Sequence, residues 1–190
     1  MAIGYLMQHG KVDIEISELQ KQATIEAKNK SFVEAIDVMK VALEKVKKSE
    51  LLYSDSTYIK VIPYFQKAGL YTEVEEFCLN ELIPSIRTAF HKGMPQRCIE
   101  TREVHFFQYV SKVYDKLRLA AKREKNGVDE TRFIKERESY SRKWQMLQPK
   151  AQQIELEKEY LEACDVFGNN IDEWPEVIKR QFNMFLQKAT

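Results

Sequence analysis

The chain has 190 residues, of which 44% are hydrophobic and 31% are charged, with 30 lysines and arginines against 29 aspartates and glutamates. This composition supports a folded core and excludes wholesale disorder, and a net charge of +1 gives no support to binding of nucleic acid or membranes through overall charge. Glycine (6) and proline (5) are scarce, which favours an all-α fold.

Residues 1–16 are predicted to form an N-terminal arm, because KVDIEIS alternates polar and apolar residues as an extended segment does. The first ten residues either pack on the body or stay loose, and their apolar side chains are Ile3, Tyr5, Leu6 and Met7. Ser17 followed by Gln20 is a capping-box pattern, so the first helix is predicted to begin at Ser17.

Three further helices are predicted in the first half of the chain, at about 32–46, 55–68 and 72–89. The third contains Pro63 and the fourth contains Pro84, and each proline should bend its helix or remove one backbone hydrogen bond. Gly69 suits the left-handed position that ends a helix.

The second half carries apolar residues at near-heptad spacing over 95–125 and 130–167, separated by the polar turn KNGVDE. This pattern predicts a long antiparallel helical hairpin, with a kink at Pro149. A last short helix should open at Asp172 or Glu173. The chain thus divides into an arm (1–16), helical repeats (17–93), a long hairpin (94–168) and a C-terminal helix (169–190), which together form one compact unit.

Residues 19–43 correspond to residues 58–82 when one is shifted by 39 positions. In this alignment apolar residues fall opposite apolar residues, as Ala23 does opposite Ile62. Lys28 likewise falls opposite Lys67. Tandem helical hairpins cannot bury their apolar faces alone, so neighbouring copies must stack. A plain helical bundle with two similar hairpins is the alternative.

KSFVEAIDVMKVALE resembles the second helix of the tetratricopeptide repeat family, with an aromatic residue after the break and small residues where helices cross: Phe32, Ala35, Met39, Ala42 and Leu43. KAGLYTEVEEF is similar to the same junction in a second copy, through Gly69 and Tyr71. The resemblance covers about residues 17–90. It departs from the family pattern at Val74 and Glu81, and in its 39-residue spacing.

The resemblance implies a short α-solenoid of two hairpins that acts as a non-enzymatic adaptor and binds a peptide or protein in a concave groove. The groove positions that it implies are Gln20, Thr24, Lys28, Ile59, Gln66 and Lys67. Lys28 and Lys67 would lie one repeat apart and could receive an acidic peptide or a terminal carboxylate. The alternative is that both are solvated surface lysines.

The long hairpin is locally polarised. From Arg102 to Lys143 there are 12 basic and 7 acidic residues, whereas Glu155 to Glu176 hold 1 lysine and 8 acidic residues. The basic tip could bind nucleic-acid phosphates, which is the second hypothesis for function, through Arg118, Lys122, Arg123, Lys125, Arg132 and Lys135. Its alternative is a charged surface with intrahelical pairs. The opposite polarities also favour self-association, as a homodimer through the hairpin, or docking within one chain.

No catalytic motif is present: the sequence has no GxGxxG, P-loop, GxSxG or HExxH pattern. Cys98 and His105, seven residues apart, could act as nucleophile and base, but a packed cysteine and a partly exposed histidine explain them as well. We therefore predict a protein that is not an enzyme and has no metal or cofactor site.

The three cysteines, Cys78, Cys98 and Cys164, are odd in number and widely spaced, which predicts free thiols in a reducing compartment. The N-terminus has no basic region of the kind that opens a signal peptide. No stretch approaches the roughly 20 apolar residues of a membrane helix. The sequence therefore predicts a cytoplasmic protein without membrane contact.

Overall fold

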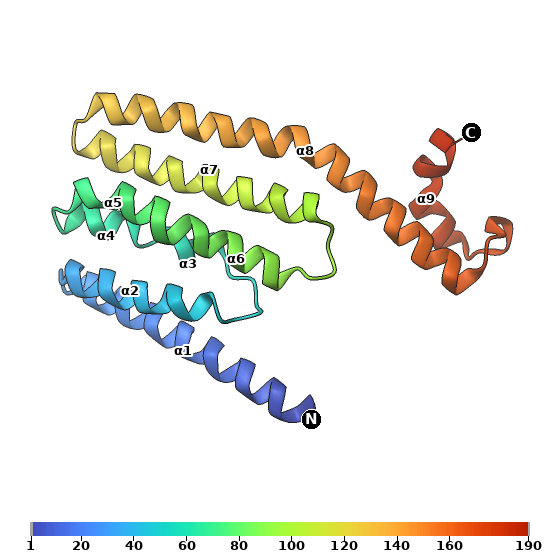
Figure 1. Ribbon diagram of the computed structural model, residues 1–190, viewed down its shortest axis with the longest axis horizontal. Coiled ribbons are helices and arrows are strands. Elements are labelled where there is room, and N and C mark those ends of the chain that lie inside the picture. The colour runs from blue at the N-terminus through green and yellow to red at the C-terminus, as the bar shows by residue number, and fades with distance from the viewer. Residues whose placement is uncertain (1, 190) are drawn as a thin grey trace.

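The computed structural model describes the backbone of residues 2–189 and the side chains of residues 10–182, and over these ranges it is helical without any strand. Figure 1 shows the helices in three stacked layers, with an extension at the C-terminal end. The first layer is α1 (Ala2–Lys28) and α2 (Phe32–Val46), the second is α3 (Asp55–Ile59), α4 (Ile62–Lys67), α5 (Tyr71–Phe77) and α6 (Ile83–Gly93), and the third is α7 (Ile99–Arg123) and α8 (Gly127–Phe167). The all-α prediction and the long antiparallel hairpin are confirmed.

The hydrophobic core lies between the layers, because α2 and α7 each turn an apolar face to the middle layer. Residues that recur at three- and four-residue steps supply these faces, as the sequence pattern predicts for packed helices. In α7 the residues with no exposed surface are Val110, Val113, Leu117 and Ala121. The exposed charged residues lie on the opposite faces of both helices.

Helix α1 begins at Ala2, so the prediction of an extended arm and of a helix that begins at Ser17 was wrong. Ile16 is fully buried, and the Asp13 carboxylate accepts hydrogen bonds from the Ser49 hydroxyl at 2.7 Å and from the Tyr53 hydroxyl. Burial, reinforced by the bond to Asp13, raises the pKa of Tyr53 to about 12. These contacts override the short alternation in the sequence, whereas the predicted packing residues Ile3, Tyr5, Leu6 and Met7 lie outside the described side chains.

The prolines divide the predicted third and fourth helices. The third breaks after Ile59 and resumes as α4, with Pro63 in its first turn, where no backbone N–H is needed. A π-helical turn, Cys78–Leu82, precedes Pro84, which likewise lies in the first turn of α6. Pro149 does not end a helix, because α8 continues through it. Figure 1 shows that α8 changes direction along its length.

The three turns between helices α1 and α2, α4 and α5, and α7 and α8 share one geometry. In each, a residue with positive φ follows the helix: Lys30 (66°), Gly69 (76°) and Lys125 (56°). The next backbone N–H bonds to the carbonyl five residues earlier, over 2.9–3.0 Å, as in a Schellman cap: Ser31 to Glu26, Leu70 to Phe65 and Asn126 to Ala121. The third turn lies outside the predicted repeat, so this geometry does not distinguish a repeat from similar hairpins.

The 39-residue correspondence persists in the burial pattern of the second helix of each hairpin. The buried pairs are Ala35 and Val74, Met39 and Cys78, Leu43 and Leu82, and Val46 and Ser85. These equivalent positions are therefore buried alike, which is consistent with stacked hairpins.

Helix α8 has 41 residues and α7 has 25, so the C-terminal part of α8 extends past the end of α7 (Figure 1). The helical turn Ile171–Glu173 and α9 (Glu176–Ala189) fold back against this extension. Helix α9 opens after Pro175, a few residues later than predicted. Trp174 and Phe182 are buried there, and the Trp174 indole donates to the Gly168 carbonyl at 2.8 Å. Two further apolar residues of this helix, Phe185 and Leu186, lie outside the described side chains.

Candidate functional site

The predicted groove residues do not form one open surface. Ile59 is only 8% exposed, so its prediction as an outward residue was wrong, because the end of α3 is packed under α7. The Thr24 hydroxyl donates to the Gln20 carbonyl at 2.7 Å and accepts from Lys60 at 2.5 Å, which ties α1 to the middle layer. Gln66 donates its side-chain amide to Glu124 at 2.8 Å. The Thr24 hydroxyl and the Gln66 amide are therefore already hydrogen-bonded within the chain, where a ligand in the groove would have to compete for them.

Lys28 and Lys67 remain exposed, and both lie beside a hairpin turn. The Lys67 ammonium is 5.3 Å from the centroid of the Phe32 ring, which opens α2. Since the three turns lie at the same end of the molecule (Figure 1), these lysines share that end with the basic tip of the long hairpin. The structure therefore brings together two sets of residues that the sequence predicted for separate sites.

We name this region the turn end and define it by six exposed basic residues from the three turns: Lys28, Lys30, Lys67, Lys122, Arg123 and Lys125. None of the six takes part in an ion pair with any of the described side chains. Their charges are therefore available to a partner. Lys30 was not predicted as a site residue, and only the stacking of the layers shows that it belongs with the others.

Two of the predicted tip arginines are already paired. Arg118 contacts Asp115 at 3.1 Å and Glu130 at 3.8 Å. Arg132 bonds Asp129 at 2.7 Å and forms a double hydrogen bond with Glu75 on α5. The tip residues Lys122, Arg123, Lys125 and Lys135 stay exposed, although Lys135 lies further along α8.

Hydrogen bonds between layers fix the position of the second and third turns. The Tyr71 hydroxyl donates to Asp129 at 2.7 Å, and Gln66 donates to Glu124 across the same junction. The hydrogen bonds from Arg132 and from Tyr71 lower the pKa of Asp129, so its carboxylate stays ionised and keeps both partners. The basic side chains beside these turns therefore project from a fixed backbone.

Apolar side chains are exposed among these charges. Ile25, Val33 and Val128 lie in the helical turns next to Lys28, Ser31 and Asn126 and are at least half exposed. Sequence reasoning missed them, because Ile25 and Val33 fit the apolar patterns of their helices. Mixed apolar and charged surfaces of this kind are typical of protein interfaces.

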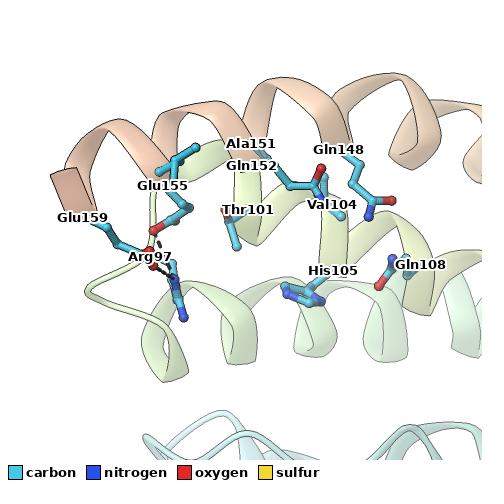
Figure 2. A pocket seen from close by; sticks show the side chains of 11 residues that line it. Arg97, Thr101, Val104, His105, Gln108, Gln148, Ala151, Gln152, Glu155 and Glu159 are labelled. Atoms are coloured by element: carbon cyan, nitrogen blue, oxygen red, sulfur yellow. Dashed lines mark hydrogen bonds and ion pairs between the residues drawn. The ribbon is translucent and has the colours of Figure 1, made fainter. Parts of the chain in front are cut away.

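A separate hollow of about 490 Å³ lies between α7 and α8. Figure 2 shows Val104 and Ala151 at its base, with the amides of Gln108, Gln148 and Gln152 around it. It opens where α8 has passed Pro149 and its small Ala151 faces α7. At one end Arg97 pairs with Glu155 at 3.3 Å and with Glu159 at 3.8 Å, so the charged groups satisfy one another.

Glu155 joins the two helices of the long hairpin. It accepts a 2.6 Å hydrogen bond from the backbone N–H of Cys98, the residue that caps α7. Partial burial raises the pKa of Glu155, but the bonds from Cys98, Thr101 and Arg97 outweigh it and hold that pKa at about 2. Ionised Glu155 therefore stabilises the end of the hairpin.

The Glu155→Gln substitution is expected to lower the free energy of unfolding by about 1–2 kcal/mol at pH 7. Because the folded pKa of about 2 lies below the ordinary value of 4.5, the stabilisation is fully present above about pH 4.5 and is lost as pH falls toward 2. Urea unfolding at several pH values measures the difference. Glu157→Gln, at an exposed position on the same helix, is the control. A deficit that persisted unchanged at pH 2 would contradict the assignment.

Cys98 and His105 are not arranged as a nucleophile and base. The Cys98 sulfur accepts from the Thr101 backbone N–H at 3.4 Å, and the His105 ring stacks on Phe90 with centroids 5.8 Å apart. Over the described side chains, no group of three histidine, cysteine, aspartate or glutamate residues is placed to hold a metal ion. These contacts agree with the alternative interpretation of the two residues, a packed cysteine and a partly exposed histidine.

Comparison of the chain with protein-family models, with curated proteins and with solved structures found no match. The tetratricopeptide resemblance thus rests on the quoted residues alone. In the part of the chain that the structure describes, no helix has the length and apolar character needed to cross a membrane.

Proposed function

We propose that this protein is a non-enzymatic binding module whose turn end holds an acidic segment of a protein partner. The observation that carries the proposal is the gathering of six exposed basic side chains, from three turns distant in sequence, at one end of the molecule, where none of them forms an ion pair with a described side chain. Charges on a fixed backbone bind more tightly than charges on mobile loops, because less freedom is lost on binding.

The tetratricopeptide resemblance supports the same class of function, since that family consists of adaptors. The contact surface that we propose differs from the family's groove. Thr24 and Gln66 are engaged within the chain, whereas Lys28 and Lys67 are exposed beside the turns. An acidic peptide lying across the turns would reach both lysines and the end of α7.

Nucleic-acid binding is the second candidate, and the exposed Lys122, Arg123, Lys125 and Lys135 favour it. A phosphate backbone selects a continuous basic surface. At the turn end the carboxylates of Asp129 and Glu130 and the apolar Val128 interrupt the basic residues. A protein partner with mixed side chains suits this surface better.

The test measures binding of a labelled oligoglutamate peptide and of a labelled single-stranded DNA by fluorescence anisotropy. Reversal at the turn end (Lys28→Glu with Lys67→Glu) is expected to weaken oligoglutamate binding about 10-fold, as the loss of two ion pairs implies. The control carries the same change of charge away from the turn end, Lys11→Glu with Lys48→Glu, and should bind within about twofold of wild type.

Equal losses in the two variants would overturn the proposal, because only overall charge would then matter. Binding of DNA without binding of oligoglutamate, abolished by Lys122→Glu with Arg123→Glu, would establish the nucleic-acid alternative instead.

A further inference from the structure

The last turns of α8 carry an exposed apolar face that nothing covers within the described chain. Leu161 is 63% exposed and Val166 is 73% exposed. Leu161 lies in the segment 130–167, for which the sequence predicts a helix packed in the hairpin. Helix α7 begins only at Ile99, opposite Glu155, so α7 does not pack on α8 beyond that level. Most of the apolar side chain of Leu161 is therefore exposed to solvent.

The other side of this segment is occupied by α9. Tyr160 packs against Trp174 with ring centroids 5.7 Å apart and against Phe182 at 5.6 Å. At 3.6 residues per turn, the uncovered side is the opposite one. We give the name arm face to these exposed residues of the segment: Glu157, Leu161, Glu162, Asp165 and Val166. At about 100° per residue, Asp165 and Glu162 lie farthest from Tyr160, and Leu161 and Val166 flank them.

The arm face is acidic as well as apolar. The segment from Glu155 to Glu176 has 8 acidic residues and 1 lysine. That lysine, Lys158, donates to the Gln96 carbonyl at 2.5 Å and lies 3.8 Å from Glu162. Glu157 and Asp165 take part in no ion pair among the described residues. The arm face therefore has the charge opposite to that of the turn end.

A single helix keeps these two surfaces apart. Gly127 opens α8 at the turn end, and α8 has 41 residues. At 1.5 Å per residue that is about 60 Å of helix, so the arm face cannot fold back onto the turn end of its own chain. Contact between the two surfaces requires a second molecule.

We propose that the arm face of one copy docks on the turn end of another, head to tail. This inference rests on the proposed function and names the acidic partner as a second copy of this chain. Glu162 and Asp165 would meet the ammonium groups of the turn end, and Leu161 and Val166, which flank them, would meet the exposed Ile25, Val33 and Val128. Complementary charges across an interface speed association and fix its orientation.

The two surfaces are different, so the contact is heterologous. Such a contact leaves one free turn end and one free arm face after two copies have joined. The association therefore continues into longer chains or closes into a ring, and it weakens as salt screens the charges.

Sedimentation velocity over a concentration series tests the inference on the full chain. Wild type should associate, and salt should reduce the association. Glu157→Lys with Asp165→Lys on the arm face should weaken it at least about 10-fold, and so should Lys122→Glu with Arg123→Glu at the turn end. One chain that carries all four reversals should associate again, since the charges are complementary once more. Circular dichroism confirms that each variant folds.

A wild type that stays monomeric but binds oligoglutamate would overturn this inference and leave the proposed function intact. A wild type that does neither would overturn both. Association that the Lys11→Glu with Lys48→Glu control weakens as much as either reversal, or that the four-fold variant fails to regain, would show that a different surface is used.

Discussion

The Ile59→Asp substitution is expected to lower the free energy of unfolding by at least about 4 kcal/mol. Ile59 is 8% exposed, and its neighbours Tyr58, Val61 and Ile62 are buried as well. The variant loses the burial of an isoleucine side chain, and its carboxyl group must either lose its hydration or take up a proton. Chemical unfolding monitored by circular dichroism measures the change.

The matched control is Ile25→Asp on α1. Ile25 is 56% exposed, so the same exchange of side chains should change stability by no more than about 0.5 kcal/mol. The comparison decides between two placements of Ile59, since a groove residue would tolerate aspartate as Ile25 does. Equal stabilities for the two variants would mean that Ile59 faces solvent.

The Phe133→Ala substitution is expected to cost about 3–5 kcal/mol, because it removes a large side chain and leaves a cavity. Phe133 is 1% exposed, and its ring centroid lies 6.2 Å from that of Tyr114 on α7. It belongs to the main core, and its contact with Tyr114 joins the two helices of the long hairpin. Urea unfolding gives the change in free energy.

Val128→Ala, five residues earlier on the same helix, serves as the control, because Val128 is exposed and this variant should lose less than about 0.5 kcal/mol of stability. If Phe133→Ala were as stable as this control, the Phe133 side chain could not be buried in the core as described. A separate early transition in Phe133→Ala would show instead that the hairpin unfolds on its own.

The sequence predicted those elements whose local pattern and tertiary packing agree. The second helix was expected at about 32–46 and is Phe32–Val46, since its apolar face is complete and breaks flank it. The long hairpin was predicted because 95–125 holds no helix breaker and its apolar spacing is sustained. Gly69 was predicted at the end of a helix and has positive φ there.

Other features depend on partners distant in sequence, which no local pattern reveals. Helix α1 continues toward the N-terminus beyond Ser17, and Asp13 and Ile16 acquire their roles only from the α2–α3 connection and the core. The turn end is a product of stacking, since its lysines come from three separate turns. Leu161 fits the apolar period of α8, and only the shorter length of α7 leaves it uncovered.

Helix α8 contains Pro149 and changes direction along its length (Figure 1), so its C-terminal part has the mechanics of a lever. Phe167 lies 18 residues beyond that proline, which is about 27 Å of helix. A change of about 10° in the bend would therefore swing the tip by about 5 Å while the three layers stay still. In the head-to-tail series of copies that we propose, the same bend would recur in every copy and would contribute to the curvature of the whole series.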